Sequence, residues 1–122
     1  MITLKSHGFK FSRPEANLVF DVSYFKNPWR DAEIKEQSDP VLRKVMVLDF
    51  MKEQRGVKEM VDSISELIWT YYWMFSKENI QIAICCSAGE YRSPAMVELV
   101  AERLRKDKQM DFIIKHSENS KI

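Results

Sequence analysis

The chain has 122 residues, of which 45% are hydrophobic and 30% are charged, and its formal net charge is only +1. This length and composition indicate one soluble globular domain, and they exclude a disordered chain or one that needs a metal ion or disulfide to fold. The balanced charge argues against a strongly basic nucleic-acid-binding protein.

Two strands and a long loop are predicted first. Residues 2–11, ITLKSHGFKF, alternate apolar and polar positions and indicate a strand, and residues 16–22, ANLVFDV, form an apolar run that suits a buried strand. Residues 23–38 have mixed charge and an Asn-Pro pair. We expect a loop there, and its length is typical of loops that carry function.

Two helices follow. Asp39 before Pro40 is a helix start, with an N-cap acceptor and then proline at the first helical position. The apolar stripe of this helix is predicted at Val41, Val45, Leu48 and Met51, and Gly56 ends the helix. The next helix runs from Val57 through the aromatic residues 69–75. We expect the rest of the fold to bury that aromatic end; the alternative is a subunit interface.

The last elements are a strand at residues 80–86, a helix at 93–106 and a strand at 110–116. A strand, a helix and a strand in this order imply a right-handed crossover and parallel pairing. We therefore predict an α/β fold: a small single domain over residues 1–122, with three layers, a mostly parallel sheet and a phosphate-binding loop between a strand and a helix.

The predicted phosphate-binding loop reads CSAGEYRS, from Cys86 to Ser93. Backbone N–H groups between a parallel strand and a helix are unpaired, and the helix dipole adds positive charge. Ala88 and Gly89 keep the turn small, and Arg92 can bind a phosphate through two hydrogen bonds. Ser93 fits the N-cap of the helix, and the residue after it, a proline, fits the first helical position.

The segment CSAGEYRSP is similar to the signature loop of dual-specificity protein phosphatases. That resemblance implies Cys86 as nucleophile, Arg92 binding the phosphoryl oxygens, and Asp31 or Asp21 as general acid. The histidine that usually precedes the cysteine is Cys85 here, and neither aspartate lies in a recognisable acid-loop motif. A small cysteine phosphatase is therefore the alternative reading and not the first.

A second resemblance covers nearly the whole chain. The segments SHGFKFSRPEANLVFDVSYFKNPW, IAICCSAGEYRS, VAERLR and IIKHS resemble the C-terminal domain of the RapZ family of RNase adapter proteins and their YvcJ-type relatives. The resemblance implies an α/β sugar-phosphate-binding domain that forms oligomers and, in some members, binds small regulatory RNAs and glucosamine-6-phosphate. Full-length members also carry an N-terminal P-loop NTPase domain; the chain contains no G-x-x-x-x-G-K-[ST] motif, so we expect no nucleotide hydrolysis.

Three departures from the family pattern remove positive charge. Glu90 and Tyr91 replace a basic pair before Arg92, Ser23 replaces an arginine, and the family's basic C-terminal tail is reduced to KHSENSKI. Contacts to phosphates supply much of the affinity for nucleic acid, so these changes weaken the expectation of RNA binding. Anion binding at the loop is still expected.

We therefore predict a non-catalytic binding or adapter module that holds a phosphorylated ligand, namely a sugar phosphate, a nucleotide or an RNA phosphate. The predicted ligand residues are Cys86, Ser87, Ala88, Gly89, Arg92 and Ser93 of the loop, completed by Asp21, Asn27, His7 and Lys10. No metal ion or cofactor is expected. An RNA- or protein-binding regulatory adapter is the further alternative.

Each of these residues also has an ordinary structural interpretation. Arg92 could pin the loop, Cys86 could be a small buried residue, and His7, Lys10 and Asp21 could serve in structural pairing or be solvated. The two adjacent cysteines cannot pair with each other and fit a reducing environment. With no apolar signal core at the N-terminus and no membrane-length run, we expect a cytoplasmic protein, with a second copy or a regulatory protein as its partner.

Overall fold

The computed structural model describes all of residues 1–122, which form strands and helices. Their order along the chain is β1 (Ile2–Gly8), β2 (Leu18–Asp21), a 3₁₀ helix (Pro28–Arg30), α1 (Ala32–Glu36), α2 (Pro40–Glu53), α3 (Val57–Met74), β3 (Ile80–Cys86), α4 (Arg92–Arg103), a π-helical segment (Leu104–Lys108) and β4 (Phe112–Lys115). No helix has both the length and the apolar character that a membrane span requires.

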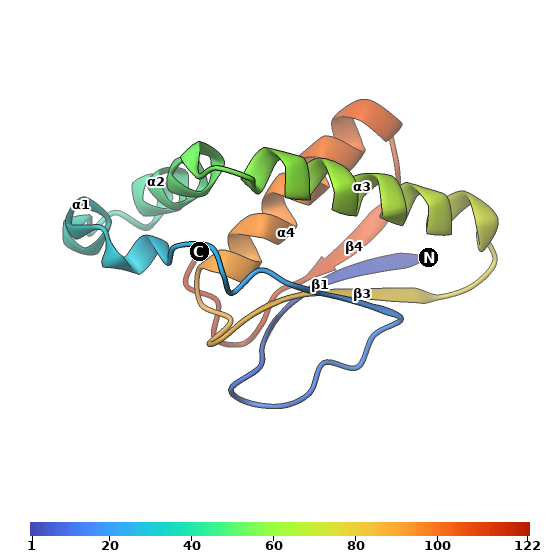
Figure 1. The fold of residues 1–122 in the computed structure, drawn as a ribbon, viewed down its shortest axis with the longest axis horizontal. Coiled ribbons are helices and arrows are strands. Elements are labelled where there is room, and N and C mark those ends of the chain that lie inside the picture. The colour runs from blue at the N-terminus through green and yellow to red at the C-terminus, as the bar shows by residue number, and fades with distance from the viewer.

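The four strands form one parallel sheet in the order β2-β3-β1-β4. The connections from β2 to β3 and from β3 to β4 move across the sheet in the same direction, so right-handed crossovers place their helices on the same face. The connection from β1 to β2 moves in the opposite direction. Figure 1 shows the result: the helices lie on one side of the sheet, and the loop at residues 9–17 lies on the other.

The core lies between the sheet and the helices. Along β1, Ile2 and Leu4 are buried toward α4, which packs on β1 and β3, whereas the alternate residues are part-exposed on the opposite face. Helices α2 and α3 then pack against α4. The predicted α/β class and parallel sheet are confirmed; the layer on the far side of the sheet is a loop and not a helix.

Local sequence signals place the starts of α2 and α3 as predicted. The Asp39 carboxylate accepts hydrogen bonds from the N–H groups of Val41 (2.9 Å) and Leu42 (3.4 Å), so it is the N-cap of α2. Gly56 precedes α3 and has φ = 90°, a left-handed conformation that glycine adopts without strain. The boundary between the two helices is therefore fixed by short-range chemistry.

Several predictions about burial, and one about secondary structure, are wrong. Val41 and Val45 are 73% and 50% exposed, whereas Met51 of the predicted stripe is buried, because α2 turns the face of Val47 and Met51 to the core. The predicted buried strand at 16–22 is the edge strand β2, so burial alternates along it and Val19 is 44% exposed. The loop predicted at 23–38 contains the 3₁₀ helix and α1.

The aromatic end of α3 is buried only on one side. Trp69, Tyr71 and Tyr72 pack partly against the core, but Trp73 is 59% exposed and Phe75 41% exposed. The expectation that the fold buries this end is therefore wrong for Trp73 and Phe75, because no other element covers the outer side of the last turn.

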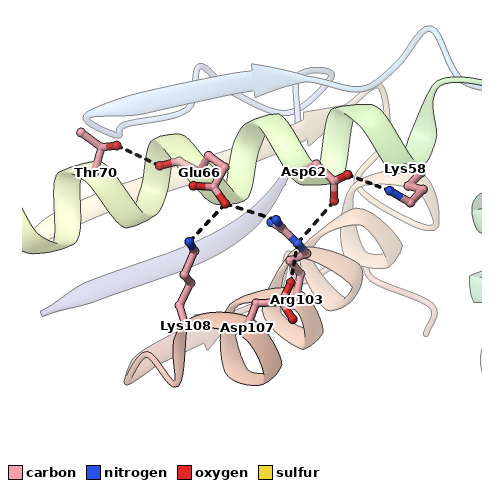
Figure 2. Close-up of polar contacts among 7 residues, drawn as sticks. All are labelled: Lys58, Asp62, Glu66, Thr70, Arg103, Asp107 and Lys108. Atoms are coloured by element: carbon pink, nitrogen blue, oxygen red, sulfur yellow. Dashed lines mark hydrogen bonds and ion pairs between the residues drawn. The ribbon is translucent and has the colours of Figure 1, made fainter.

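A network of charged side chains joins α3 to the end of α4 (Figure 2). Arg103 contacts Asp62 of α3 at 3.4 Å, Glu66 of α3 at 3.2 Å and Asp107 of the π-helical segment at 2.8 Å. Hydrogen bonds from Lys58 to Asp62 and from Lys108 to Glu66 lower the pKa of each carboxyl, as does the positive charge of Arg103. This network lies at the edge of the contact between α3 and α4, whose centre is formed by buried apolar residues of both helices.

Replacement of the α2 cap tests how far α2 depends on Asp39. We expect Asp39→Ala to lower the free energy of unfolding by about 1 kcal/mol, because two N–H groups of the first turn lose their acceptor. Chemical denaturation measures the change. Asp49→Ala is the matched control: Asp49 is an exposed aspartate of the same helix and accepts no hydrogen bond, so an equal loss in both variants would contradict the capping role.

Candidate anion-binding site

The loop between β3 and α4 has unpaired backbone donors. The start of the loop is held through its carbonyl groups: those of Cys86 and Ser87 accept hydrogen bonds from the N–H groups of Phe9 and Lys10, both at 2.9 Å. In contrast, the N–H groups of residues 87–91 donate no hydrogen bond to any protein atom. Five successive free N–H groups next to a helix N-terminus are the donors that bind anions in proteins.

Two glycines let this loop cross the end of β1. A methyl group on Gly8 would lie only 2.6 Å from the carbonyl carbon of Ala88 and 2.7 Å from its oxygen. Gly89 has φ = 71°, and a methyl group there would lie 2.9 Å from the nitrogen of Gly8. Because main chain contacts main chain at this crossing, neither position has room for a side chain.

The sequence predicted Ser93 as the N-cap of the helix, and this prediction is wrong. Helix α4 begins at Arg92, and Ser93 is fully buried in its first turn. The Ser93 hydroxyl donates to the carbonyl of His7 at 3.3 Å and accepts from the Cys86 thiol at 3.3 Å, while the Ser93 N–H donates to the Cys86 sulfur at 3.4 Å. Ser93 therefore holds the two ends of the loop to β1.

Arg92 is anchored at one end of its guanidinium and available at the other. Its Nη1 donates to the carbonyls of Ser23 and Phe25, the latter at 3.2 Å. Nη2 has only a 3.5 Å contact with the Ser87 hydroxyl, and Nε donates no hydrogen bond. The edge formed by Nε and Nη2 can bind two oxygens of one anion, which is the geometry that arginine uses for phosphate.

A cavity of about 140 Å³, which we call the loop cavity, opens beside these groups. Of the predicted site residues, it brings together Asn27, Cys86, Ala88 and Arg92. The remaining lining residues are Trp29, Glu90 and Tyr91, whose contribution the sequence did not indicate. Trp29 and Tyr91 stack with their ring centroids 5.2 Å apart and form an aromatic wall. Only the position of Trp29 after the Asn-Pro pair could have suggested its place.

The carboxylate of Glu90 is balanced by the C-terminal segment. The Lys121 ammonium lies 3.9 Å from the Glu90 carboxylate, and the Lys121 N–H donates to the Glu90 carbonyl at 2.9 Å. The negative charge that Glu90 brings to the loop cavity therefore has a cationic neighbour, which reduces its repulsion of a bound anion.

Burial shifts the pKa values of two groups near the loop. It raises the pKa of Tyr91; the negative charge of Glu90 adds to this rise, and the positive charge of Arg43 opposes it. It also raises the pKa of the Cys85 thiol to about 12, with a smaller contribution from the charge of Asp21. Both groups are therefore uncharged at neutral pH, and Cys85 is a core residue.

Besides Ser87, Gly89 and Ser93 of the loop itself, four further predicted residues do not line the loop cavity. The side chain of His7 projects to the opposite face of the sheet, where its Nε2 contacts the carbonyl of Ser12 at 2.8 Å. Lys10 is exposed. Asp21 accepts hydrogen bonds from the N–H and hydroxyl of Ser23.

The remaining one is Asp31, the general acid of the phosphatase alternative. Its carboxylate is the N-cap of α1 and accepts from the N–H groups of Glu33 (2.9 Å) and Ile34 (3.2 Å). No group of three His, Cys, Asp or Glu side chains is arranged to hold a metal ion.

Comparisons with known proteins agree on one family. The sequence model described as the RapZ C-terminal domain matches residues 1–120. A protein of Synechococcus sp. (strain JA-3-3Ab) named as a nucleotide-binding protein is 32% identical over 107 residues, covering 85% of this chain and 31% of that protein.

Two further relatives carry the same kind of name. A nucleotide-binding protein of Thermobifida fusca is 36% identical over 107 residues, covering 82% of this chain and 34% of the relative. A nucleotide-binding protein of Neisseria meningitidis serogroup B is 30% identical over 122 residues, covering 95% of this chain and 40% of the relative. The chain thus spans about a third of the length of the curated relatives it matches.

Replacing Gly8 tests the crossing between β1 and the loop. We expect Gly8→Ala to lower the free energy of unfolding by about 1–3 kcal/mol, because the added methyl overlaps the main chain of Ala88. The amide NMR signals of residues 87–91 should also move.

Gly56→Ala is the control, since it introduces strain at a positive φ but meets no atom closer than 3.8 Å. It should destabilise the protein without moving the loop amides. Loop signals that shift equally in both variants would show that the crossing does not shape the loop.

Proposed function

The chain belongs to the RapZ C-terminal domain family, and from this membership we propose that it is a non-catalytic module that holds a phosphorylated ligand at the loop between β3 and α4. The ligand classes that fit are sugar phosphates and nucleotides. The names of the Synechococcus and Thermobifida relatives support a nucleotide or a related phosphorylated compound.

The observation that carries this proposal is the set of five free N–H groups at residues 87–91. A backbone N–H that finds no partner inside the protein must be satisfied by water or by a ligand. A phosphate offers several acceptor oxygens at once and also complements the positive end of α4. Arg92 adds the charge and the two-pronged geometry that a phosphate monoester needs.

The surroundings of the loop cavity favour a small ligand over RNA. The cavity is about 140 Å³, and Glu90 is one of its lining residues. Basic groups along an extended track, which RNA binding requires, are missing where Ser23, Glu90 and Tyr91 stand. Partner proteins or a second copy would instead contact the exposed aromatic end of α3, at Trp73 and Phe75.

A cysteine phosphatase is the second candidate, and one contact favours it. The Cys86 sulfur accepts a hydrogen bond from the Ser93 N–H and lines the loop cavity, so it lies next to the position where a phosphate would bind. However, the Asp31 and Asp21 carboxylates are both engaged by nearby N–H groups, so neither is positioned as a general acid. Binding without turnover therefore remains our first proposal.

Ligand-dependent thermal stability tests the binding proposal. We expect inorganic phosphate, a sugar phosphate or a nucleoside monophosphate to raise the melting temperature. In Arg92→Lys the affinity should fall about ten- to a hundredfold, because lysine keeps the charge but loses the two-pronged hydrogen bond. Each variant is compared with its own ligand-free baseline, which removes any intrinsic loss of stability.

Arg13→Lys is the matched control, since Arg13 is an exposed arginine on the loop at residues 9–17 and makes no ion pair. It should retain the affinity of the original protein. Failure of every phosphorylated compound to stabilise the protein, or equal stabilisation of Arg92→Lys and the original protein, would rule out the proposed site.

Turnover of an aryl phosphate separates the two candidates. We expect none, because Asp31 and Asp21, the two candidate general acids, both accept hydrogen bonds from nearby N–H groups and lie outside the loop cavity. The Cys86→Ser variant is the control for contaminating activity. Vanadate-sensitive turnover that is lost in Cys86→Ser would instead establish the phosphatase.

A further inference from the structure

The face of the sheet without helices carries a second cavity, which shares no lining residue with the loop cavity. This cavity, the sheet-face cleft, has a volume of about 380 Å³ and lies between the loop at residues 9–17 and the segment after β4. Most of its lining is polar or charged: Lys5, Ser6, His7, Gly8, Phe11, Ser12, Pro14, Glu15, Ala83, Lys115, His116, Ser117, Glu118 and Asn119.

Two lysines stand side by side in the cleft. Lys5 of β1 and Lys115 of β4 are register partners in the parallel ladder, so their side chains project from the same face of the sheet. Neither ammonium lies within ion-pair distance of a carboxylate, although the chain forms eight other such contacts. Like charges directly opposite each other destabilise a sheet, and no carboxylate of the protein is close enough to pair with either ammonium.

A hydrogen bond holds the Lys5 ammonium in place and leaves some of its donors free. The Lys5 Nζ donates to the carbonyl of Glu15 at 2.8 Å, which fixes the ammonium but uses only one of its three N–H groups. One pleat further along β1, His7 contacts the carbonyl of Ser12 through Nε2. A carbonyl can only accept, so Nε2 carries the proton and Nδ1 is left without a protein partner.

Two carboxylates limit what the cleft can bind. Glu15 and Glu118 also line it, so its total charge is close to neutral although the two ammonium groups are adjacent. A polyanion such as RNA would meet both carboxylates and gain little. A small molecule with one compact doubly charged group could place that group between Lys5 and Lys115.

We propose that the sheet-face cleft is a second anion-binding site, which takes a small molecule carrying a phosphate monoester or a pair of carboxylates between Lys5 and Lys115. Hydroxyl groups of the same molecule would contact Ser12, His7 and Asn119. The site does not depend on the loop cavity, because the His7 carbonyl is bonded to Ser93 on one side of β1 while the His7 side chain lies in the cleft on the other.

Amide NMR titration with inorganic phosphate and with succinate tests this site. We expect one or both probes to give saturable shifts at Lys5, His7, Ser12 and residues 115–119. Lys115→Gln should weaken binding up to about fivefold, in line with one exposed ion pair, and Lys5→Gln combined with Lys115→Gln should abolish saturation.

Two controls make the result decisive. Lys106→Gln, a charge removal outside the cleft, and Arg92→Lys, which alters only the loop cavity, should leave the cleft titration unchanged. The proposal is overturned if neither probe gives saturable shifts at the cleft, if sodium chloride of the same ionic strength reproduces them, or if the double lysine variant binds as tightly as the original protein.

Discussion

The contact between the loop after β3 and the end of β1 is the constraint on which the rest of the candidate site depends. Main chain lies against main chain there, with Gly8 and Gly89 leaving no room for a side chain. The hydrogen bonds of this contact run from Phe9 and Lys10 to loop carbonyls, and from the buried Ser93 hydroxyl to the carbonyl of His7. The loop is thus held by its carbonyl groups and by the first turn of α4.

That arrangement explains why the N–H groups of the loop are free. A loop fixed through its carbonyls and at both ends has no acceptor nearby for its own donors, and residues 87–91 accordingly find none in the protein. The Arg92 guanidinium is likewise held by carbonyls on one side and free on the other. Its Nη1 donates to two carbonyls of the segment after β2, while the edge formed by Nε and Nη2 stays open. The protein therefore presents donors that are already in position, and an anion would bind without reorganising them.

The sequence predicted the features that depend on short-range chemistry. Asp39 with Pro40, Gly56, and the apolar run ending at Cys86 each determine local structure within a few residues, and the structure confirms all of them. The strand-loop-helix order was likewise enough to predict the parallel sheet. The open backbone at residues 87–91 follows from this order, although its lack of protein acceptors could be seen only in three dimensions.

Features that depend on distant partners were missed. The stack of Trp29 on Tyr91 joins residues 62 positions apart, and the burial of Ser93 requires the carbonyl of His7. The place of His7 was predictable in principle: it alternates with Ile2 and Leu4, which face the core, so its side chain had to project to the other face. The exposure of Val41 could not be predicted, since two apolar faces of α2 compete and only packing on α4 selects one.

The most direct test of the account is an amide NMR titration of the loop with inorganic phosphate. If the free N–H groups form the anion site, the signals of several residues among 87–91 should move downfield together, with one dissociation constant that rises in Arg92→Lys. Loop signals that stay in place at saturating phosphate, while the protein remains folded, would contradict the central claim that these N–H groups are shaped to bind an anion.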